Sequence, residues 1–248
     1  MIPLRDNLPT RQLPIITVII IGLNAYVYLK EFLLGSYAAR RFIVYYGLIP
    51  CGLTGQCDIV GRAFSPEVTL LTSMFVHAGF FHVAGNMLYL WIFGNNIEDS
   101  MGKIRFIIFY LLSGLGAAFA QVLLNPASQV PMVGASGAVS GILGAYLLLF
   151  PHARVLTLIP LGFFTQLAEI PAVIVLGFWI VVQLANGVLT FNFEGGGVAW
   201  FAHIGGFAVG ILLIGLFKRR TVPWGWQSRR MRHDSREGCH VSIRSETG

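Results

Sequence analysis

Charged residues are scarce in this sequence. Asp, Glu, Lys and Arg make up 11% of its 248 residues, and hydrophobic residues make up 55%. Because a soluble domain carries about 25% charged residues, this composition excludes an ordinary soluble globular protein and indicates a chain that crosses a membrane several times. Cysteine is also rare, since three residues are too few for a disulfide scaffold and lack the spacing of a zinc ribbon. Cys51 and Cys57 share one predicted loop and are candidates for a disulfide if that loop faces an oxidising compartment.

Several motifs of hydrolases and of targeting signals are absent. No His-Glu-x-x-His pattern occurs, which weighs against a zinc metalloprotease. The Gly-x-Ser-x-Gly elbow of soluble hydrolases fails at Ser136, because Ala138 takes the place of its last glycine. The first apolar run lacks a small-residue cleavage site, so we expect a membrane span there and not a removed signal peptide.

Six apolar runs approach the length of about 20 residues that a helix needs to cross a membrane, although the fourth is short. They cover residues 14–34, 68–97, 106–124, 136–150, 168–189 and 198–217. We therefore predict an all-α polytopic membrane protein with six transmembrane helices in residues 1–217. Residues 218–248 are polar and Arg-rich, and we expect a disordered cytoplasmic tail there.

The orientation follows from the Lys and Arg residues of the loops, because cytoplasmic loops carry an excess of them. The side that holds both termini has Arg5, Arg11, Lys103, Arg105, Arg154, Lys218, Arg219, Arg220, Arg229, Arg230, Arg232, Arg236 and Arg244. The opposite side has Arg40, Arg41 and Arg62, with Lys30 at the edge of a span. We therefore place both termini in the cytoplasm and residues 35–67 outside, with short elements in the membrane interface. We expect a multi-pass protein of a bacterial plasma membrane.

Polar residues of three predicted spans converge at one depth. Spans two, four and six all enter the membrane from the outside, and His82, Asn86, Ser136 and His203 lie near their outer ends. His82 and Asn86 are four residues apart, so they share a helical face. Polar groups buried in spans are unfavourable and usually mark a functional site. We therefore predict that a hydroxyl, two imidazoles and an amide form one site.

The fourth and sixth spans have small faces that allow their backbones to approach closely. These faces consist of Gly137, Gly141 and Gly144 on one helix and of Gly206 and Gly210 on the other. Such contact would bring His203 to Ser136, and a serine hydroxyl needs an adjacent base to act as a nucleophile. No Asp or Glu lies in the outer halves of spans two, four and six, so only a two-residue dyad is available.

Other interpretations of these residues remain open from the sequence. Small residues in apolar helices usually serve packing, which would explain Ser136 and also Ser140, one turn below it. A zinc site of His77, His82 and His203 lacks the residues that would orient its ligands, and we expect His77 to be structural, in the interface above span two. A channel or transporter with a polar midpoint is a further possibility. Three acidic residues are expected as cytoplasmic boundary charges, namely Glu98, Asp99 and Glu169.

Three short motifs occur in order along the chain, namely His82-x-x-x-Asn86, Gly134-Ala135-Ser136-Gly137 and Ala202-His203-x-x-Gly206. Together they resemble the motifs of the rhomboid intramembrane serine proteases, and similar flanking residues extend the resemblance from Ile2-Pro3-Leu4-Arg5-Asp6 to about Phe217. The resemblance implies that Ser136 is the nucleophile and His203 the general base. It implies that His82, Asn86 and the backbone N–H of Ser136 hold the oxyanion.

The resemblance also implies that the enzyme uses no metal or cofactor and cleaves transmembrane segments of other proteins near their outer ends. Its partners would be transmembrane substrates and membrane lipid, and we expect no nucleic acid. Two departures stand out: Ser140 occupies a position where many members carry an aromatic residue against the base, and the Trp-Arg pair of the first outer loop is missing. These leave the orientation of His203 open. A non-catalytic relative that binds client transmembrane helices is the alternative.

Overall fold

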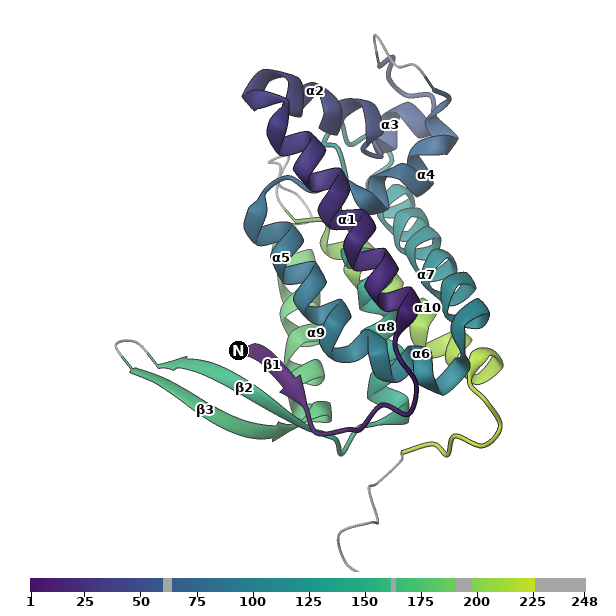
Figure 1. Cartoon of the computed structure of the whole chain (residues 1–248). Coiled ribbons are helices and arrows are strands. Elements are labelled where there is room, and N and C mark those ends of the chain that lie inside the picture. The colour runs from purple at the N-terminus through teal and green to yellow at the C-terminus, as the bar shows by residue number, and fades with distance from the viewer. Residues whose placement is uncertain (60–63, 162–163, 191–197, 226–248) are drawn as a thin grey trace, which may run out of the picture.

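The computed structural model describes residues 1–59, 64–161, 164–190 and 198–225. Most of the chain forms one bundle of helices, closed at one end by short helices and flanked at the other by a small β-sheet (Figure 1). Four helices are long and apolar enough to cross a membrane: α1 (Ile15–Leu33), α7 (Lys103–Leu124), α9 (Ala172–Leu189) and α10 (Trp200–Phe217). The chain is therefore an integral, multi-pass membrane protein.

The expected number of six spans depends on how two further segments are counted. The helical pair Pro66–Phe75 and Phe80–Met101 passes the same test as one unit, but it is bent by 78°. Helix α8 (Ser136–Leu149) has 14 residues, which is about 21 Å at 1.5 Å per residue and short of the roughly 30 Å hydrocarbon core. The residues around its start are buried, among them Ala135 and Ala138, so α8 begins inside the bundle.

The second apolar run is broken into short segments and is not the continuous helix that its hydropathy predicts. The segments before the break are η1 (Pro66–Val68), α4 (Thr69–Thr72) and η2 (Ser73–Phe75), and those after it are α5 (Phe80–Tyr89), the π-helical η3 (Leu90–Gly94) and α6 (Asn95–Met101). Val76 adopts an extended backbone, and the carbonyl of Ser73 accepts a hydrogen bond from the N–H of Gly134 at 2.8 Å. The break therefore brings residues 73–79 beside the chain that leads into α8.

A three-stranded antiparallel sheet corrects the expectation of an entirely helical chain. Strands β1 (Ile2–Asp6), β2 (Arg154–Leu161) and β3 (Phe164–Pro171) lie in the order β1-β2-β3. Leu158 of β2 pairs with Ile2 on one side and with Leu167 on the other. The fifth predicted span therefore begins late, at Ala172, because residues 168–171 belong to β3. Apolar composition alone did not separate these strand residues from the helix that follows.

Helix α1 is held at its start by an acidic residue from another element. Glu98 of α6 accepts hydrogen bonds from the N–H groups of Ile16 and Thr17 at 3.0 and 2.8 Å, and its side chain is 3% exposed. A carboxylate at this position satisfies N–H groups that lack helical partners and opposes the positive end of the helix dipole. Glu98, expected as a cytoplasmic boundary charge, is thus a buried residue that caps the start of α1.

The end of the bundle opposite the sheet carries α2 (Gly35–Tyr46) and α3 (Pro50–Leu53). These are the short elements predicted for residues 35–67. A disulfide joins Cys51 and Cys57 across a Cα–Cα distance of 5.3 Å, which agrees with the candidate pair of the sequence. Arg62, which the sequence placed in this segment, lies outside the described residues.

The first part of the tail returns to the bundle. The N–H of Arg219 donates to the carbonyl of Ser100 at 2.9 Å, and the N–H of Gly225 donates to that of Leu148 at 3.2 Å. Lys218 lies over the ring of Trp224 at 4.9 Å. The disorder expected from residue 218 onwards therefore does not apply to residues 218–225, and residues 226–248 lie outside the described part of the chain.

Candidate active site

Helices α8 and α10 touch through their backbones, as their small faces predict. A Cβ added at Gly206 would meet the main-chain oxygen of Gly137, and one added at Gly210 would meet that of Gly141. A Cβ added at Gly144 would meet the main-chain oxygen of Phe207. The predicted close approach is confirmed, because no side chain fits at these crossing points.

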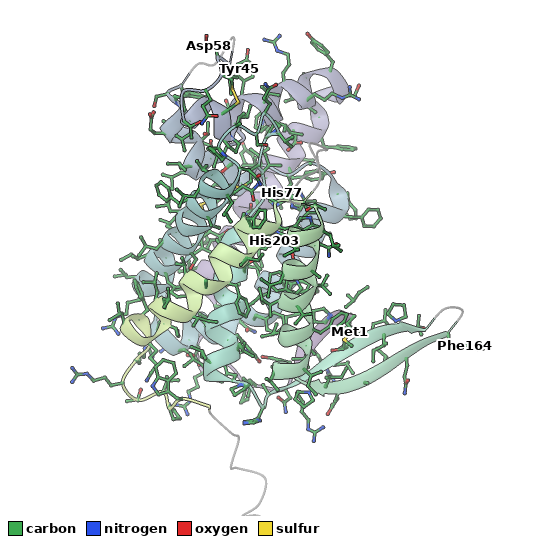
Figure 2. The ribbon with its side chains drawn as sticks, turned by 180° about the vertical axis from the view of Figure 1, so that it is seen from behind. Met1, Tyr45, Asp58, His77, Phe164 and His203 are labelled. Atoms are coloured by element: carbon green, nitrogen blue, oxygen red, sulfur yellow. A yellow bond between two sulfur atoms is a disulfide. The ribbon has the colours of Figure 1, made fainter. Side chains whose placement is uncertain are left out.

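This contact brings Ser136 and His203 together. Ser136 is the first residue of α8 and His203 lies in the first turn of α10. The distance between Oγ of Ser136 and Nε2 of His203 is 2.8 Å, which is hydrogen-bonding distance for a hydroxyl and an imidazole. Figure 2 shows His203 inside the bundle, between the end marked by Tyr45 and Asp58 and the end marked by Met1 and Phe164.

The ring of His203 is packed by tryptophans and not by a residue of α8. Trp179 of α9 lies at a centroid distance of 5.9 Å with a tilt of 34°, and Trp200 meets the ring edge-on at 6.3 Å. Ser140, where the sequence departs from the family pattern, instead donates its hydroxyl to the carbonyl of Ser136 at 2.6 Å. Trp179 therefore supplies from α9 the aromatic packing that Ser140 cannot.

Gln183 is a site residue that the sequence interpretation missed. It lies on α9, is 5% exposed, and places its Oε1 2.7 Å from Nδ1 of His203. Trp179 and Gln183 are four residues apart, so a single face of α9 provides both contacts with His203. The sequence signal was one of two amide side chains in an apolar helix, four residues after a tryptophan.

The loop before α8 packs against His82 and Asn86 of α5. Gly134 has a positive φ of 118°, and a Cβ added there would lie 2.7 Å from Nε2 of His82 and 3.4 Å from Nδ2 of Asn86. Glycine is required at this position both for the backbone conformation and for the space that the two side chains occupy. The structure thus brings His82 and Asn86 beside the residues that lead into Ser136, as the shared depth predicted.

His77 lies within the site, which corrects the expectation that it sits in the interface above. Its side chain is fully buried, and its Nε2 is 3.0 Å from Nδ2 of Asn86 and 3.4 Å from the N–H of Ala135. Its N–H donates to Glu31 of α1 at 3.4 Å, so that Glu31 faces inward and not towards the membrane surface. His77 therefore links the break in the second apolar run to Asn86 and to the start of α8.

The histidines of the site do not form a metal centre with other ligands. Within the part of the chain that the structure describes, no group of three or more His, Cys, Asp or Glu side chains is placed to hold a metal ion. The rings of His77 and His82 meet edge-on at a centroid distance of 5.1 Å. His203 thus contacts Ser136 itself, while His82 and Asn86 lie against Gly134, two residues before it.

Fold and site define the class as a polytopic helical membrane protein with a serine–histidine pair buried between two helices. The family profile described as "Rhomboid domain" matches residues 66–220, which include every residue of this pair and its neighbours. The chain belongs to the rhomboid family. Among similar proteins, RHOMBOID-like protein 1 of Arabidopsis thaliana is 36% identical over 182 residues, covering 69% of this chain and 42% of that protein.

Two further relatives come from other kingdoms. Rhomboid protein 1, mitochondrial, of Saccharomyces cerevisiae is 30% identical over 182 residues, covering 69% of this chain and 45% of that protein. Rhomboid protease GluP of Bacillus subtilis is 32% identical over 161 residues, covering 62% of this chain and 28% of that protein. The matches thus span less than half the length of these relatives.

Proposed function

We propose that this chain is an intramembrane serine endopeptidase that cleaves transmembrane segments of other membrane proteins near their outer ends. The observation that carries the proposal is the 2.8 Å contact between Oγ of Ser136 and Nε2 of His203. A similar protein of Bacillus subtilis is named as a rhomboid protease, which supports the same reaction class. The site needs no metal or cofactor for this chemistry.

In the proposed mechanism, Oγ of Ser136 attacks the carbonyl carbon of a substrate peptide bond while its proton passes to Nε2 of His203. The C–N bond then breaks, and the departing amine takes that proton, which leaves an acyl-enzyme. Water attacks the acyl-enzyme with His203 again as the base, and the acid product leaves Ser136. One histidine nitrogen therefore serves both halves of the reaction as base and as acid.

The negative charge on the carbonyl oxygen needs donors in the poorly solvated interior of the bundle. The backbone N–H of Ser136 at the first position of α8 has no partner within its own helix. His82 and Asn86 of α5 lie against Gly134, two residues before Ser136, and the Asn side chain has two amide hydrogens. We assign the oxyanion to these three donors.

In the proposed orientation, the protein lies in a bacterial plasma membrane and both termini are on its cytoplasmic side. The basic residues at the sheet end support it, because cytoplasmic segments carry an excess of Lys and Arg. Among the described residues these are Arg5, Arg11, Lys103, Arg105, Arg154, Lys218, Arg219 and Arg220. The opposite end carries the Cys51–Cys57 disulfide, and disulfides persist in oxidising compartments. The site then opens towards the outer half of the membrane.

Labelling with a fluorophosphonate and cleavage of a transmembrane reporter substrate test this function. Ser136→Ala should abolish labelling, and Ser136→Ala and His203→Ala should each lower cleavage by at least about 10³-fold. The double variant should be no worse than either single one, because the pair acts as a unit. Two matched controls should stay near wild type: Ser113→Ala removes a buried serine hydroxyl of α7, and His152→Ala removes an exposed histidine.

A chain that folds and inserts but is neither labelled nor active on any reporter would contradict the proposal. It would favour the non-catalytic alternative, in which the chain binds client transmembrane helices without cleaving them. Cleavage that survives Ser136→Ala would also contradict it, since the nucleophile would then lie elsewhere.

A further inference from the structure

The proposed dyad has a side chain in the place where a triad carries its acidic residue. Nδ1 of His203 is 2.7 Å from Oε1 of Gln183, while Nε2 of the same ring faces Ser136. Nucleophile, imidazole and amide thus form a continuous chain of hydrogen-bonding groups across α8, α10 and α9. In a serine hydrolase the third group holds the imidazole in the tautomer and orientation that the reaction needs.

The second contact of the Gln183 amide fixes which of its ends faces the histidine. Its Nε2 lies 3.3 Å from the main-chain carbonyl of Trp179, and a carbonyl oxygen can only accept a hydrogen bond. The nitrogen end of the amide must therefore point to Trp179, and the oxygen end must point to His203. An oxygen at that position can only accept, so Nδ1 of His203 carries the proton and Nε2 presents its lone pair to the Ser136 hydroxyl.

We propose that Gln183 is a positioning residue of the protease, fixing the tautomer and the ring orientation of His203 in place of an acidic third residue. The inference rests on the proposed function and adds to it a residue outside the motifs that carry the family resemblance. A neutral amide suits this location, because a carboxylate buried in a membrane-spanning bundle is far more costly to desolvate than an amide with both ends paired. Trp179 completes the arrangement by packing on the ring that Gln183 orients.

Two substitutions at Gln183 separate positioning from packing. Positioning predicts that Gln183→Glu is the more active variant, and packing predicts that Gln183→Met is. Gln183→Met keeps the length and volume of the side chain but removes the acceptor, whereas Gln183→Glu keeps the acceptor and introduces a buried charge. Positioning predicts that Gln183→Met lowers kcat by about 10- to 100-fold, less than the 10²–10⁴-fold worth of the base itself, with KM nearly unchanged. It predicts that Gln183→Glu retains more activity than Gln183→Met.

The pH profile of the Glu variant gives a second readout. A carboxylate beside Nδ1 stabilises the imidazolium, so the acidic limb of kcat/KM should move to higher pH by about one unit or more. Among the described residues, His82 of α5 is the titratable group that acts electrostatically on His203, and α9 contributes no Asp, Glu, Lys, Arg or His. A shift seen in Gln183→Glu and absent from Gln183→Met therefore reports on the new carboxylate.

The matched control is Asn186→Leu on the same helix. The Asn186 amide donates to the carbonyl of Val182 at 2.8 Å, which is the same kind of intrahelical bond that Gln183 makes to Trp179. Removing it should leave kcat, KM and the pH profile unchanged. Thermal melting of all variants checks that differences in rate are not differences in folded protein.

Nitrogen-15 NMR of the histidines gives a readout that does not depend on activity. The signal of His203, identified among the six histidines by its loss in His203→Ala, should show Nδ1 protonated in the wild type and a mixture of tautomers in Gln183→Met. If Gln183→Met keeps wild-type kcat and a single Nδ1-protonated ring, or is more active than Gln183→Glu, the inference is overturned. If the wild type is not labelled by a fluorophosphonate, the proposed function fails first, while the tautomer measurement still decides the role of Gln183.

Discussion

The contacts of Asn86 allow both a structural role and a catalytic one, and substitution can separate the two. Its Nδ2 bonds with His77 at 3.0 Å, which engages one amide hydrogen and leaves a second for the oxyanion. We predict that Asn86→Ala lowers turnover per folded molecule by about 10²–10³-fold, the usual loss for one oxyanion donor. Ser136 should still react with a small fluorophosphonate, but more slowly, because the nucleophile and base are intact. Turnover is measured on folded protein beside the melting temperature.

Asn24→Ala provides the control for Asn86. Asn24 is another buried asparagine of a span, and its amide donates to the carbonyl of Ile20 at 2.7 Å. This variant should lower thermal stability without lowering turnover per folded molecule. The same behaviour in Asn86→Ala would make Asn86 a scaffold residue and would leave the oxyanion to His82 and the Ser136 backbone.

The residues that sequence could predict are those marked by both chemistry and position. Ser136, His203, His82 and Asn86 are polar groups near the ends of apolar runs, and membrane burial makes such groups conspicuous. Gln183 is also polar, but its contact with His203 depends on the rotation of α9 about its axis. The sequence does not give this rotation, because apolar residues occur on nearly every face of α9. The same uncertainty applies to Trp179.

His77 was missed for a different reason. Its position follows from a break in the second apolar run, and hydropathy does not distinguish a continuous helix from two helices bent by 78°. In a continuous helix, His77 would lie near its outer end, at the membrane surface. The bend instead turns His77 inward, to Asn86 and Ala135.

At the scale of elements, the crossing of α8 and α10 depends on glycine. A Cβ at Gly206 would meet the main-chain oxygen of Gly137, the residue after Ser136. A main-chain atom cannot relieve this clash by a change of rotamer, as a side chain can. We predict that Gly206→Ala destabilises the protein by about 1–3 kcal/mol, as overpacking does. It should also lower the rate of fluorophosphonate labelling, because separating the helices separates Ser136 from His203. Melting temperature and labelling rate are the two measurements.

Gly22→Ala on α1 is the matched control, since an added Cβ there has no atom within 4 Å. Alanine stabilises a helix by about 1 kcal/mol relative to glycine. This variant should therefore melt at or above the wild-type temperature and react with the fluorophosphonate at the wild-type rate. Normal labelling in Gly206→Ala would mean that α10 can shift without moving His203, contrary to the contact described.

The elements that sequence predicted well are those with long apolar runs. The first, third and sixth runs each form one helix close to its expected range, because about 20 apolar residues leave few alternatives. The sheet was not predicted, because its strands are short and only the last residues of β3, 168–171, fell within an apolar run, where they were read as the start of the fifth span. Pro171 marks the true start of α9, since proline is tolerated at the start of a helix but not within it.

At the scale of the whole molecule, Asp6 couples the sheet to the bundle. It ends β1 and accepts hydrogen bonds from Tyr146 of α8 and Asn96 of α6, both at 2.6 Å. Burial raises the pKa of this carboxyl from 3.8 to about 6, although the hydrogen bond from Tyr146 opposes the shift. The folded protein thus binds a proton at Asp6 between these two pH values, where the unfolded chain has released it.

The sign of the pH dependence follows from that difference. The folded state holds more protons than the unfolded state between pH 3.8 and about 6, so stability falls as pH rises through this window and is level above it. We predict that Asp6→Asn removes up to about 3 kcal/mol of this pH dependence. Melting curves of wild type and variant between pH 4 and pH 7 measure it. Parallel curves for the two proteins would show that Asp6 has an ordinary pKa.

The backbone contact between α8 and α10 has a consequence for how much of the sequence the site constrains. Where main chains touch, the separation of Ser136 and His203 is set by peptide units and by the absence of side chains at Gly206 and Gly210. Side chains on the outer surface of α10, such as Leu212 and Leu216 at 75% and 78% exposure, take no part in that spacing. A water-soluble redesign that exchanged such outward residues for polar ones would therefore leave the distance between hydroxyl and imidazole as it is.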